Sequence, residues 1–153
     1  MSIAGRIMKE RFETFTVLIT KISRNIRRIK NQKMADYDLR SPQISCLYYL
    51  YSDEGITATE LCERCEEDKA TISRSLEHLK ENGYLLPSGS GTRKYRSPLR
   101  LTEKGREVAK RVHDKVDRVL NEINACLTEE ERLSFYRSLT IISDSLDRIA
   151  TDD

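Results

Sequence analysis

Apolar residues recur with a helical period in the first third of this chain. They follow one another at spacings of four and three residues, which places them on one face of a helix with 3.6 residues per turn. The pattern therefore predicts one long helix that ends near Lys33. The residues of this stripe are Phe15, Ile19, Ile22, Ile26 and Ile29.

Two more helical stripes occupy the last third. One stripe follows Thr102, a helix-capping residue. Its partner position, three residues on, holds Gly105 and not the acid of a capping box. The other stripe follows Thr128 and three glutamates. Such stripes must be buried against another surface, and the second has heptad-like spacing, so we expect the terminal helices to dimerise. The stripes are Val108, Val112, Val116, Val119, Ile123 and Leu127, then Phe135, Leu139, Ile142, Leu146 and Ile149.

Between these ends the pattern predicts shorter helices. Ser41-Pro42 starts one, with Pro42 at its first position, and Gly55 ends that segment. Thr57 and Glu60 then have the spacing of a capping box, which opens a short helix to about Cys65.

The next stretch, DKATISRSLEHLKENG over residues 68–83, reads as a third helix with an N-cap at Asp68 and a C-terminal glycine at Gly83. Ile72, Leu76 and Leu79 form its buried stripe, and its other side carries small and basic residues. Two short helices joined by a tight turn indicate a helix-turn-helix.

Beyond Gly83 the pattern changes to that of a β-hairpin. Tyr84-Leu85-Leu86 is a short apolar strand, residues 87–91 are a turn rich in Gly and Ser, and residues 95–101 return as a weaker strand. Pro98 is acceptable there only on a sheet edge. The tip of this hairpin is basic.

Length and composition are those of one charge-rich helical domain. The chain has 153 residues, of which 38% are hydrophobic and 34% charged, with no tryptophan. Its apolar runs are too short to span a bilayer, and its first residues lack a secretory signal, so we expect a cytoplasmic protein. Residues 1–35 hold nine basic and two acidic residues, and residues 68–100 hold seven and three, which suggests a surface for a polyanion.

Several of these segments together resemble a known protein family. ITATELCERCEEDKATISRSLEHLKENGYL, the basic hairpin and LRLTEKGREV are similar to the winged helix-turn-helix of the MarR (multiple antibiotic resistance regulator) family of transcription factors. The resemblance implies a mainly α fold with a small β-hairpin wing. It implies a single domain over residues 1–153, with a winged helix-turn-helix at 41–101 flanked by dimerisation helices at 1–35 and 102–153.

The resemblance also implies a homodimer on a pseudo-palindromic operator in double-stranded DNA, with residues 68–82 as the recognition helix in the major groove. Arginine can bind guanine or phosphate with two hydrogen bonds, short hydroxyls suit bases or phosphates, and an alanine methyl can contact thymine. Wing arginines suit a narrow minor groove, although this wing has Arg93-Lys94 where the family usually has Asp-Arg. The DNA-contacting residues predicted in this way are Lys69, Ala70, Thr71, Ser73, Arg74, His78, Arg93, Lys94 and Arg96.

A small-molecule effector is expected to lower the affinity of such a repressor for its operator. It would bind between the dimer helices and the winged region, where Tyr48, Tyr49 and Tyr51 lie. We expect no cofactor and no membrane partner.

Other classes of function find less support. Cys62-x-x-Cys65 lacks a second ligand pair for a metal, so these two cysteines, like Cys46 and Cys126, are expected to be reduced core residues. His78 and His113 do not make a zinc or nucleophile site by themselves, and no acid–base set indicates an enzyme. Two alternatives remain: a redox-sensing regulator that uses Cys62, and a winged-helix module for protein interactions.

Overall fold

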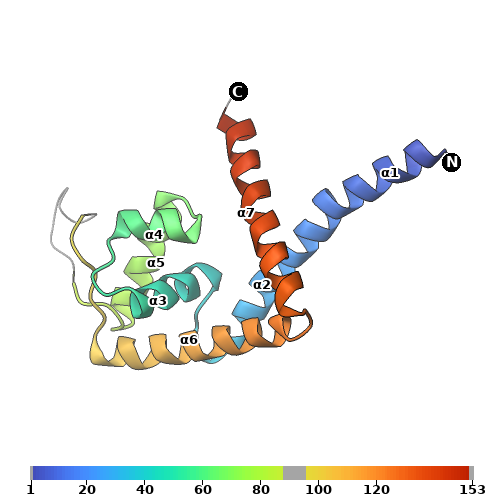
Figure 1. Ribbon diagram of the computed structural model, residues 1–153. Coiled ribbons are helices and arrows are strands. Elements are labelled where there is room, and N and C mark those ends of the chain that lie inside the picture. Colours follow the sequence, from blue (N-terminus) through green and yellow to red (C-terminus); the bar gives the residue numbers. More distant parts are fainter. Residues whose placement is uncertain (1, 88–95, 152–153) are drawn as a thin grey trace. The chain divides into compact units, whose positions relative to one another are not determined.

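The computed structural model describes residues 2–87 and 96–151, and its elements are helices (Figure 1). Contacts divide the chain into two compact units, Met1–Asp114 and Lys115–Asp153, and the boundary falls within α6. A single domain over 1–153 therefore stays a prediction. The elements are α1 (Ile3–Phe12), η1 (Glu13–Leu18), α2 (Ile19–Lys33), η2 (Ala35–Tyr37), α3 (Ser41–Ser52), α4 (Ala58–Cys65), α5 (Lys69–Glu81), α6 (Glu103–Asn124) and α7 (Glu129–Thr151).

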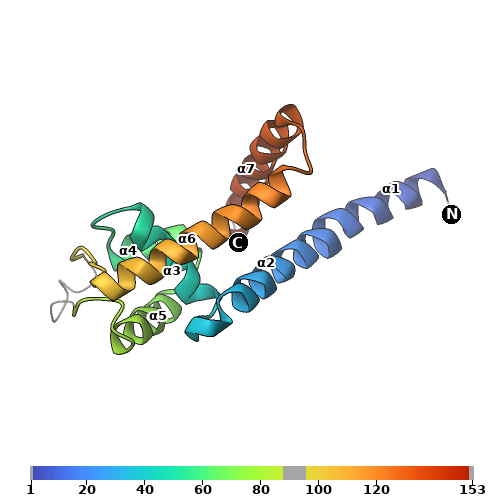
Figure 2. The same ribbon diagram turned by 90° about the horizontal axis from the view of Figure 1, so that it is seen from below.

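The predicted N-terminal helix is confirmed, with one irregularity. α1, the π-helical segment η1 and α2 form a continuous helical run that ends at Lys33 (Figures 1 and 2). Most of its apolar stripe is exposed, and Phe15, Ile22 and Ile26 are 48%, 46% and 44% accessible. This face is therefore unburied in the single chain.

The core of the first unit lies among α3, α4 and α5, which contact one another pairwise. The largest apolar side chains there are almost fully buried, because each helix turns its stripe inward. They include Ile44, Leu47, Leu61, Ile72 and Leu79, which are at most 1% exposed.

Helix caps place the starts of these helices. The predicted capping box of α4 is confirmed: the Thr57 amide donates to the Glu60 carboxylate at 2.7 Å, and the Glu60 amide donates to the Thr57 hydroxyl at 3.2 Å. α3 starts one residue earlier than expected, because its N-cap is Arg40, whose amide donates to Gln43 Oε1 at 2.8 Å. Pro42 is thus the second helical residue and not the first.

The base of the predicted wing is formed by one antiparallel bridge between Leu85 and Leu101. The Leu86 amide donates to the Arg100 carbonyl at 2.9 Å, and the Thr102 amide donates to the Tyr84 carbonyl at 3.0 Å. Residues 88–95 lie outside the described part of the chain, so the β-hairpin wing beyond this bridge stays a prediction.

The second unit contains the end of α6 and all of α7. The Thr128 cap is confirmed, since its amide donates to Glu131 Oε2 at 2.8 Å and its hydroxyl accepts from the Glu131 amide at 3.2 Å. Cys126 was expected in the core but is exposed, because it lies in the connection between the two helices. Among residues 2–87 and 96–151, no helix is long and apolar enough to cross a membrane.

Gly105 permits a close contact between the first turn of α6 and the wing base. A Cβ atom at this position would overlap the Tyr84 carbonyl group, so we expect Gly105→Ala to lower the free energy of unfolding by about 1–3 kcal/mol. Urea unfolding followed by circular dichroism measures this. Glu107→Ala, at an exposed position of the same helix, is the control and is expected to change stability by less than about 0.5 kcal/mol. Equal effects of the two variants would contradict the steric argument.

Candidate nucleic-acid interface

The outward face of α5 begins at its N-cap, Asp68. The Asp68 carboxylate accepts from the Thr71 amide at 2.7 Å, as predicted for a capping residue. This backbone hydrogen bond, followed by one from the Thr71 hydroxyl, holds the pKa of Asp68 below its usual value. The carboxylate therefore stays ionised at the positive end of the helix dipole.

A chain of hydrogen bonds continues from this cap along the outward face. The Thr71 hydroxyl donates to Asp68 Oδ2 at 3.0 Å, and Arg74 Nη2 donates to Thr71 Oγ1 at 3.1 Å. Thr71 thus links the cap to the guanidinium group and restrains its direction, while the other N–H groups of Arg74 can still donate. The i, i+3 spacing of these three residues is the sequence signal for this chain of hydrogen bonds.

Five of the predicted DNA-contacting residues share the first two turns of α5. Lys69, Ala70 and Arg74 are exposed, and Thr71 and Ser73 are half-buried. The structure therefore brings two cations, a methyl group and two hydroxyls together on one short surface.

The other predicted DNA-contacting residues do not lie on this exposed surface of α5. His78 is half-buried, and its Nε2 atom is enclosed without a hydrogen-bond partner among the described residues, so in this conformation it points into the protein. Arg96 is exposed. Arg93 and Lys94 lie outside the described residues, and their part in a wing stays a prediction.

The C-terminal end of α5 is tied to α6. The Thr102 hydroxyl donates to the Gly83 carbonyl at 2.6 Å, and Lys104 Nζ donates to the Asn82 carbonyl at 2.9 Å. These bonds satisfy carbonyls that the helix end leaves without intrahelical partners. Gly83 takes a φ of +73°, which confirms the predicted glycine at this position.

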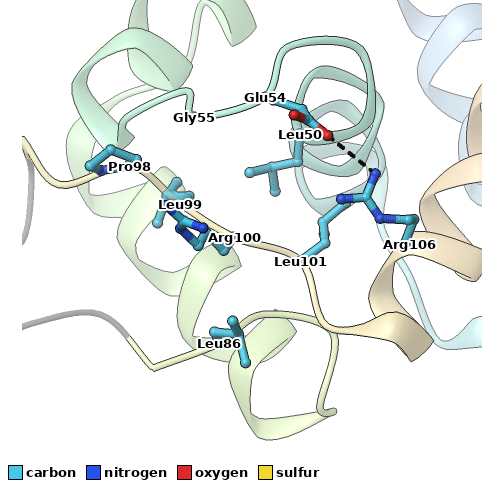
Figure 3. A pocket seen from close by; sticks show the side chains of 9 residues that line it. All are labelled: Leu50, Glu54, Gly55, Leu86, Pro98, Leu99, Arg100, Leu101 and Arg106. Carbon is cyan, nitrogen blue, oxygen red and sulfur yellow. Dashed lines mark ion pairs between the residues drawn. The ribbon is translucent and has the colours of Figure 1, made fainter.

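A cavity of about 460 Å³ lies beside the wing base. Its lining is polar and apolar in equal parts, and on one side Arg106 Nη1 pairs with Glu54 Oε1 at 3.6 Å (Figure 3). The lining offers one carboxylate and two guanidinium groups, which is not a set for nucleophilic or acid–base catalysis. The residues are Leu50, Glu54, Gly55, Leu86, Pro98, Leu99, Arg100, Leu101 and Arg106.

The tyrosines predicted near an effector site belong to an aromatic cluster. The Tyr48 ring stacks on His113 with centroids 4.8 Å apart, and Tyr51 lies 5.2 Å from the same ring. Tyr49 meets Tyr48 edge-on at 5.7 Å and carries the Arg64 guanidinium 5.7 Å above its ring. His113 thus packs against aromatic rings, and α3 and α6 contribute to one half-buried surface.

The cysteines are unpaired by disulfides, as expected, but only Cys46 is fully buried. Cys62 and Cys65 are half-buried rather than core residues, because α4 is short and its last turn reaches the surface. Within the described ranges, no group of three or more His, Cys, Asp or Glu side chains is arranged to hold a metal ion.

Comparisons with known proteins agree with this architecture. Residues 37–94 match the sequence model of the MarR family. The chain is 21% identical over 135 residues to the HTH-type transcriptional regulator BilQ of Clostridioides difficile (strain CD3), a match that covers 87% of this chain and 90% of that protein.

Solved structures share the fold. The crystal structure of the S. aureus MepR–DNA complex has a TM-score of 0.76 at 22% identity, covering 86% of this chain and 97% of that one. NMB1585, a MarR family regulator from Neisseria meningitidis, has a TM-score of 0.77 at 17% identity, covering 93% and 97%.

The fold and the outward helix therefore define a mainly helical protein in which α4 and α5 form a helix-turn-helix. The sequence match over residues 37–94 and the shared fold confirm the resemblance drawn from the sequence. Residues 37–94 thus carry the sequence pattern of the MarR family, and the described structure has the fold of the solved relatives.

The Asp68 cap makes the stability of α5 depend on pH. Because the folded-state pKa of Asp68 lies below its ordinary value of 3.8, its contribution is complete above that value and is lost as pH falls through the lower folded-state pKa. We expect the urea midpoints of wild type and Asp68→Ala to differ more at neutral pH than at about pH 3. Asp68→Asn, which can still cap, is the control and should unfold close to wild type at neutral pH. A difference independent of pH would contradict this role of the carboxylate.

Proposed function

We propose that this chain is a homodimeric, sequence-specific DNA-binding transcriptional regulator that acts in the cytoplasm as a ligand-responsive repressor and has no enzymatic activity. The observation that carries the proposal is the outward face of α5. There Arg74 is held by Thr71 at 3.1 Å, beside exposed Lys69 and Ala70, within the segment that matches the MarR family.

The side chains of this face suit the major groove. A guanidinium group can donate two hydrogen bonds to guanine O6 and N7, and Thr71 already limits the directions in which Arg74 points. Small neighbours such as Ala70 and Ser73 allow the helix to approach base edges closely. Lys69, at the helix start, is assigned to a phosphate, which positions the protein without reading sequence.

Dimerisation is supported by apolar surface that the single chain leaves unburied. On α7, Phe135, Leu139 and Leu146 are 45%, 38% and 53% exposed, although they form one helical stripe. Stripes of this kind must be covered, and a second copy of the chain supplies matching surfaces through a two-fold axis. Two copies of α5 would then read two half-sites about one helical turn apart, roughly 34–36 Å.

Repression and the response to an effector are the finer parts of the proposal. They rest on the family resemblance and on the half-buried aromatic surface of Tyr48, Tyr51 and His113, which can stack against a planar ligand. A ligand there would lower operator affinity only if it bound better to a dimer geometry that misplaces the two α5 helices.

DNA binding is tested by selecting bound duplexes from a random pool and then measuring affinity by fluorescence anisotropy. We expect a pseudo-palindromic site bound on the order of 10³-fold or more tightly than a scrambled duplex at physiological salt. Arg74→Ala should weaken binding to this site by roughly 5- to 150-fold.

Lys110→Ala is the matched control, because it also removes one positive charge but lies on α6, where its ammonium pairs with Asp114 at 2.8 Å. It should bind the selected site nearly as wild type does. Failure to enrich any site, or equal losses for both variants, would contradict specific recognition through α5 and favour the interaction-module alternative.

The dimer is tested by size-exclusion chromatography with light scattering. Wild type should have twice the 17.8 kDa mass of one chain, and Leu139→Asp should shift the mass towards the monomer because it places a charge in the apolar stripe. Arg137→Asp, at an exposed position on the opposite side of α7, should stay dimeric. A monomeric wild type at micromolar concentration would overturn this part of the proposal.

A further inference from the structure

The Thr71 hydroxyl lies between two groups whose hydrogen-bonding roles are fixed. An ionised carboxylate only accepts hydrogen bonds, so the Thr71 hydroxyl donates its proton to Asp68 Oδ2 at 3.0 Å. A guanidinium group only donates, so the oxygen of the same hydroxyl accepts from Arg74 Nη2 at 3.1 Å. Thr71 therefore has no proton left to donate to a phosphate or to guanine while both bonds are made.

Asp68 uses both of its oxygens in this arrangement. Oδ1 accepts from the Thr71 amide at 2.7 Å, and Oδ2 accepts from the Thr71 hydroxyl. These bonds hold the pKa of Asp68 below its usual value, so the carboxylate is ionised at neutral pH. An asparagine side chain has one accepting oxygen and a donating amide nitrogen. It can cap the helix through the oxygen, but its nitrogen would then face the Thr71 hydroxyl as a donor and compete with Arg74.

The bond to Thr71 restrains Arg74 before any DNA is bound. Arg74 is exposed on the outward face of α5, where a free arginine side chain samples many rotamers and loses that freedom on binding. A guanidinium group is planar, so a hydrogen bond at Nη2 limits the orientation of the whole plane. The remaining N–H groups are then a preorganised set of donors, which lowers the entropic cost of binding guanine.

The Asp68 carboxylate has a second effect, because it is exposed at the start of the same helix. A negative charge there repels the phosphates of DNA of any sequence. Binding through α5 is therefore weakened for all sequences alike, and the loss is recovered only where Arg74 bonds to a base. Such a repulsive element increases the difference in affinity between the right and the wrong sequence.

We propose that Asp68 and Thr71 determine which DNA sequence α5 prefers without contacting a base themselves. They hold the Arg74 guanidinium so that it donates two hydrogen bonds to O6 and N7 of one guanine. Both are positioning residues, and Arg74 is the member of this hydrogen-bonded set that contacts DNA. The inference rests on the proposed function, and it gives Thr71 a role different from the direct DNA contact expected from the sequence.

Four substitutions separate positioning from capping and packing. Thr71→Val keeps the β-branched shape but removes the hydroxyl, whereas Thr71→Ser keeps the hydroxyl. Asp68→Asn keeps the cap but alters the bond to the hydroxyl and removes the charge. Ser73→Ala is the matched control, because it removes a half-buried hydroxyl of the same helix that is not part of this set. Circular dichroism and urea midpoints establish that each variant folds.

The readout is fluorescence anisotropy on the selected DNA site and on copies in which one guanine at a time is replaced by 7-deazaguanine, which lacks the N7 acceptor. For wild type, one such replacement should weaken binding on the order of ten-fold. This ratio should fall to about two-fold or less in Thr71→Val and Asp68→Asn, and stay near the wild-type value in Thr71→Ser and Ser73→Ala. Asp68→Asn should also bind a scrambled duplex more tightly than wild type does, because it removes a negative charge.

A purely structural role of Thr71 gives a different result. Thr71→Val would then weaken binding to both kinds of duplex equally and leave the ratio unchanged. An unchanged ratio in Thr71→Val or in Asp68→Asn would overturn the proposal, as would a wild type that is insensitive to 7-deazaguanine at every guanine. An Asp68→Asn variant that binds scrambled DNA no more tightly than wild type would overturn the repulsive role of the carboxylate.

Nuclear magnetic resonance of the free protein tests the positioning without DNA. Nitrogen relaxation at Arg74 Nε reports motion of the guanidinium group on the picosecond-to-nanosecond timescale. The group should be ordered in wild type and Thr71→Ser and more mobile in Thr71→Val, and equal mobility in all three would overturn the restraint. If Arg74 is ordered in a protein that selects no DNA site, the proposed function fails while the positioning stands. If a site is selected and Thr71→Val keeps the wild-type ratio, this inference fails alone.

Discussion

Burial of one face of α5 is the constraint on which the rest of this structure depends. Ile72 and Leu79 are 1% and 0% exposed, and the helix that carries them contacts both α3 and α4. Burying each such side chain contributes roughly 1.5–3 kcal/mol, so rotation of α5 about its axis would expose apolar surface at a large cost. The opposite face, with Arg74, therefore points outward in every state in which this core is intact.

The same helix is held at both ends by its neighbours. At its start, the Asp68 cap follows the end of α4 after a short turn. At its end, Thr102 and Lys104 bond to carbonyls at Gly83 and Asn82 at 2.6 and 2.9 Å, and Gly105 brings α6 against Tyr84. The two hydrogen bonds lie at the surface and the Gly105 contact is close, so together they hold the end of α5 against the start of α6.

Much of this could be predicted from local sequence signals. Caps at Thr57, Asp68 and Thr128 and the stripe of α5 were read correctly, since capping and helical period depend on residues three or four apart. The partial exposure of Cys62 and Cys65 could not be predicted, because it depends on how the last turn of α4 packs against the rest of the unit. The position of the His78 ring could not be predicted for the same reason. The helical period places His78 beside the buried stripe, but the packing of the neighbouring helices decides whether its ring faces solvent or protein.

The sequence also does not predict what covers the apolar stripes of the terminal helices. Period shows that one face of α2 and one face of α7 are apolar, but it does not say whether the covering surface comes from the same chain. Within one chain these faces stay exposed to solvent, since Ile22 is 46% and Leu146 53% exposed. The apolar stripe of α5, in contrast, is buried. The two kinds of stripe have the same pattern of residues and differ in what surrounds them. Cys126 is a related case: free cysteine packs as a small hydrophobe, which predicts a core position, but the residue is exposed in the connection between α6 and α7.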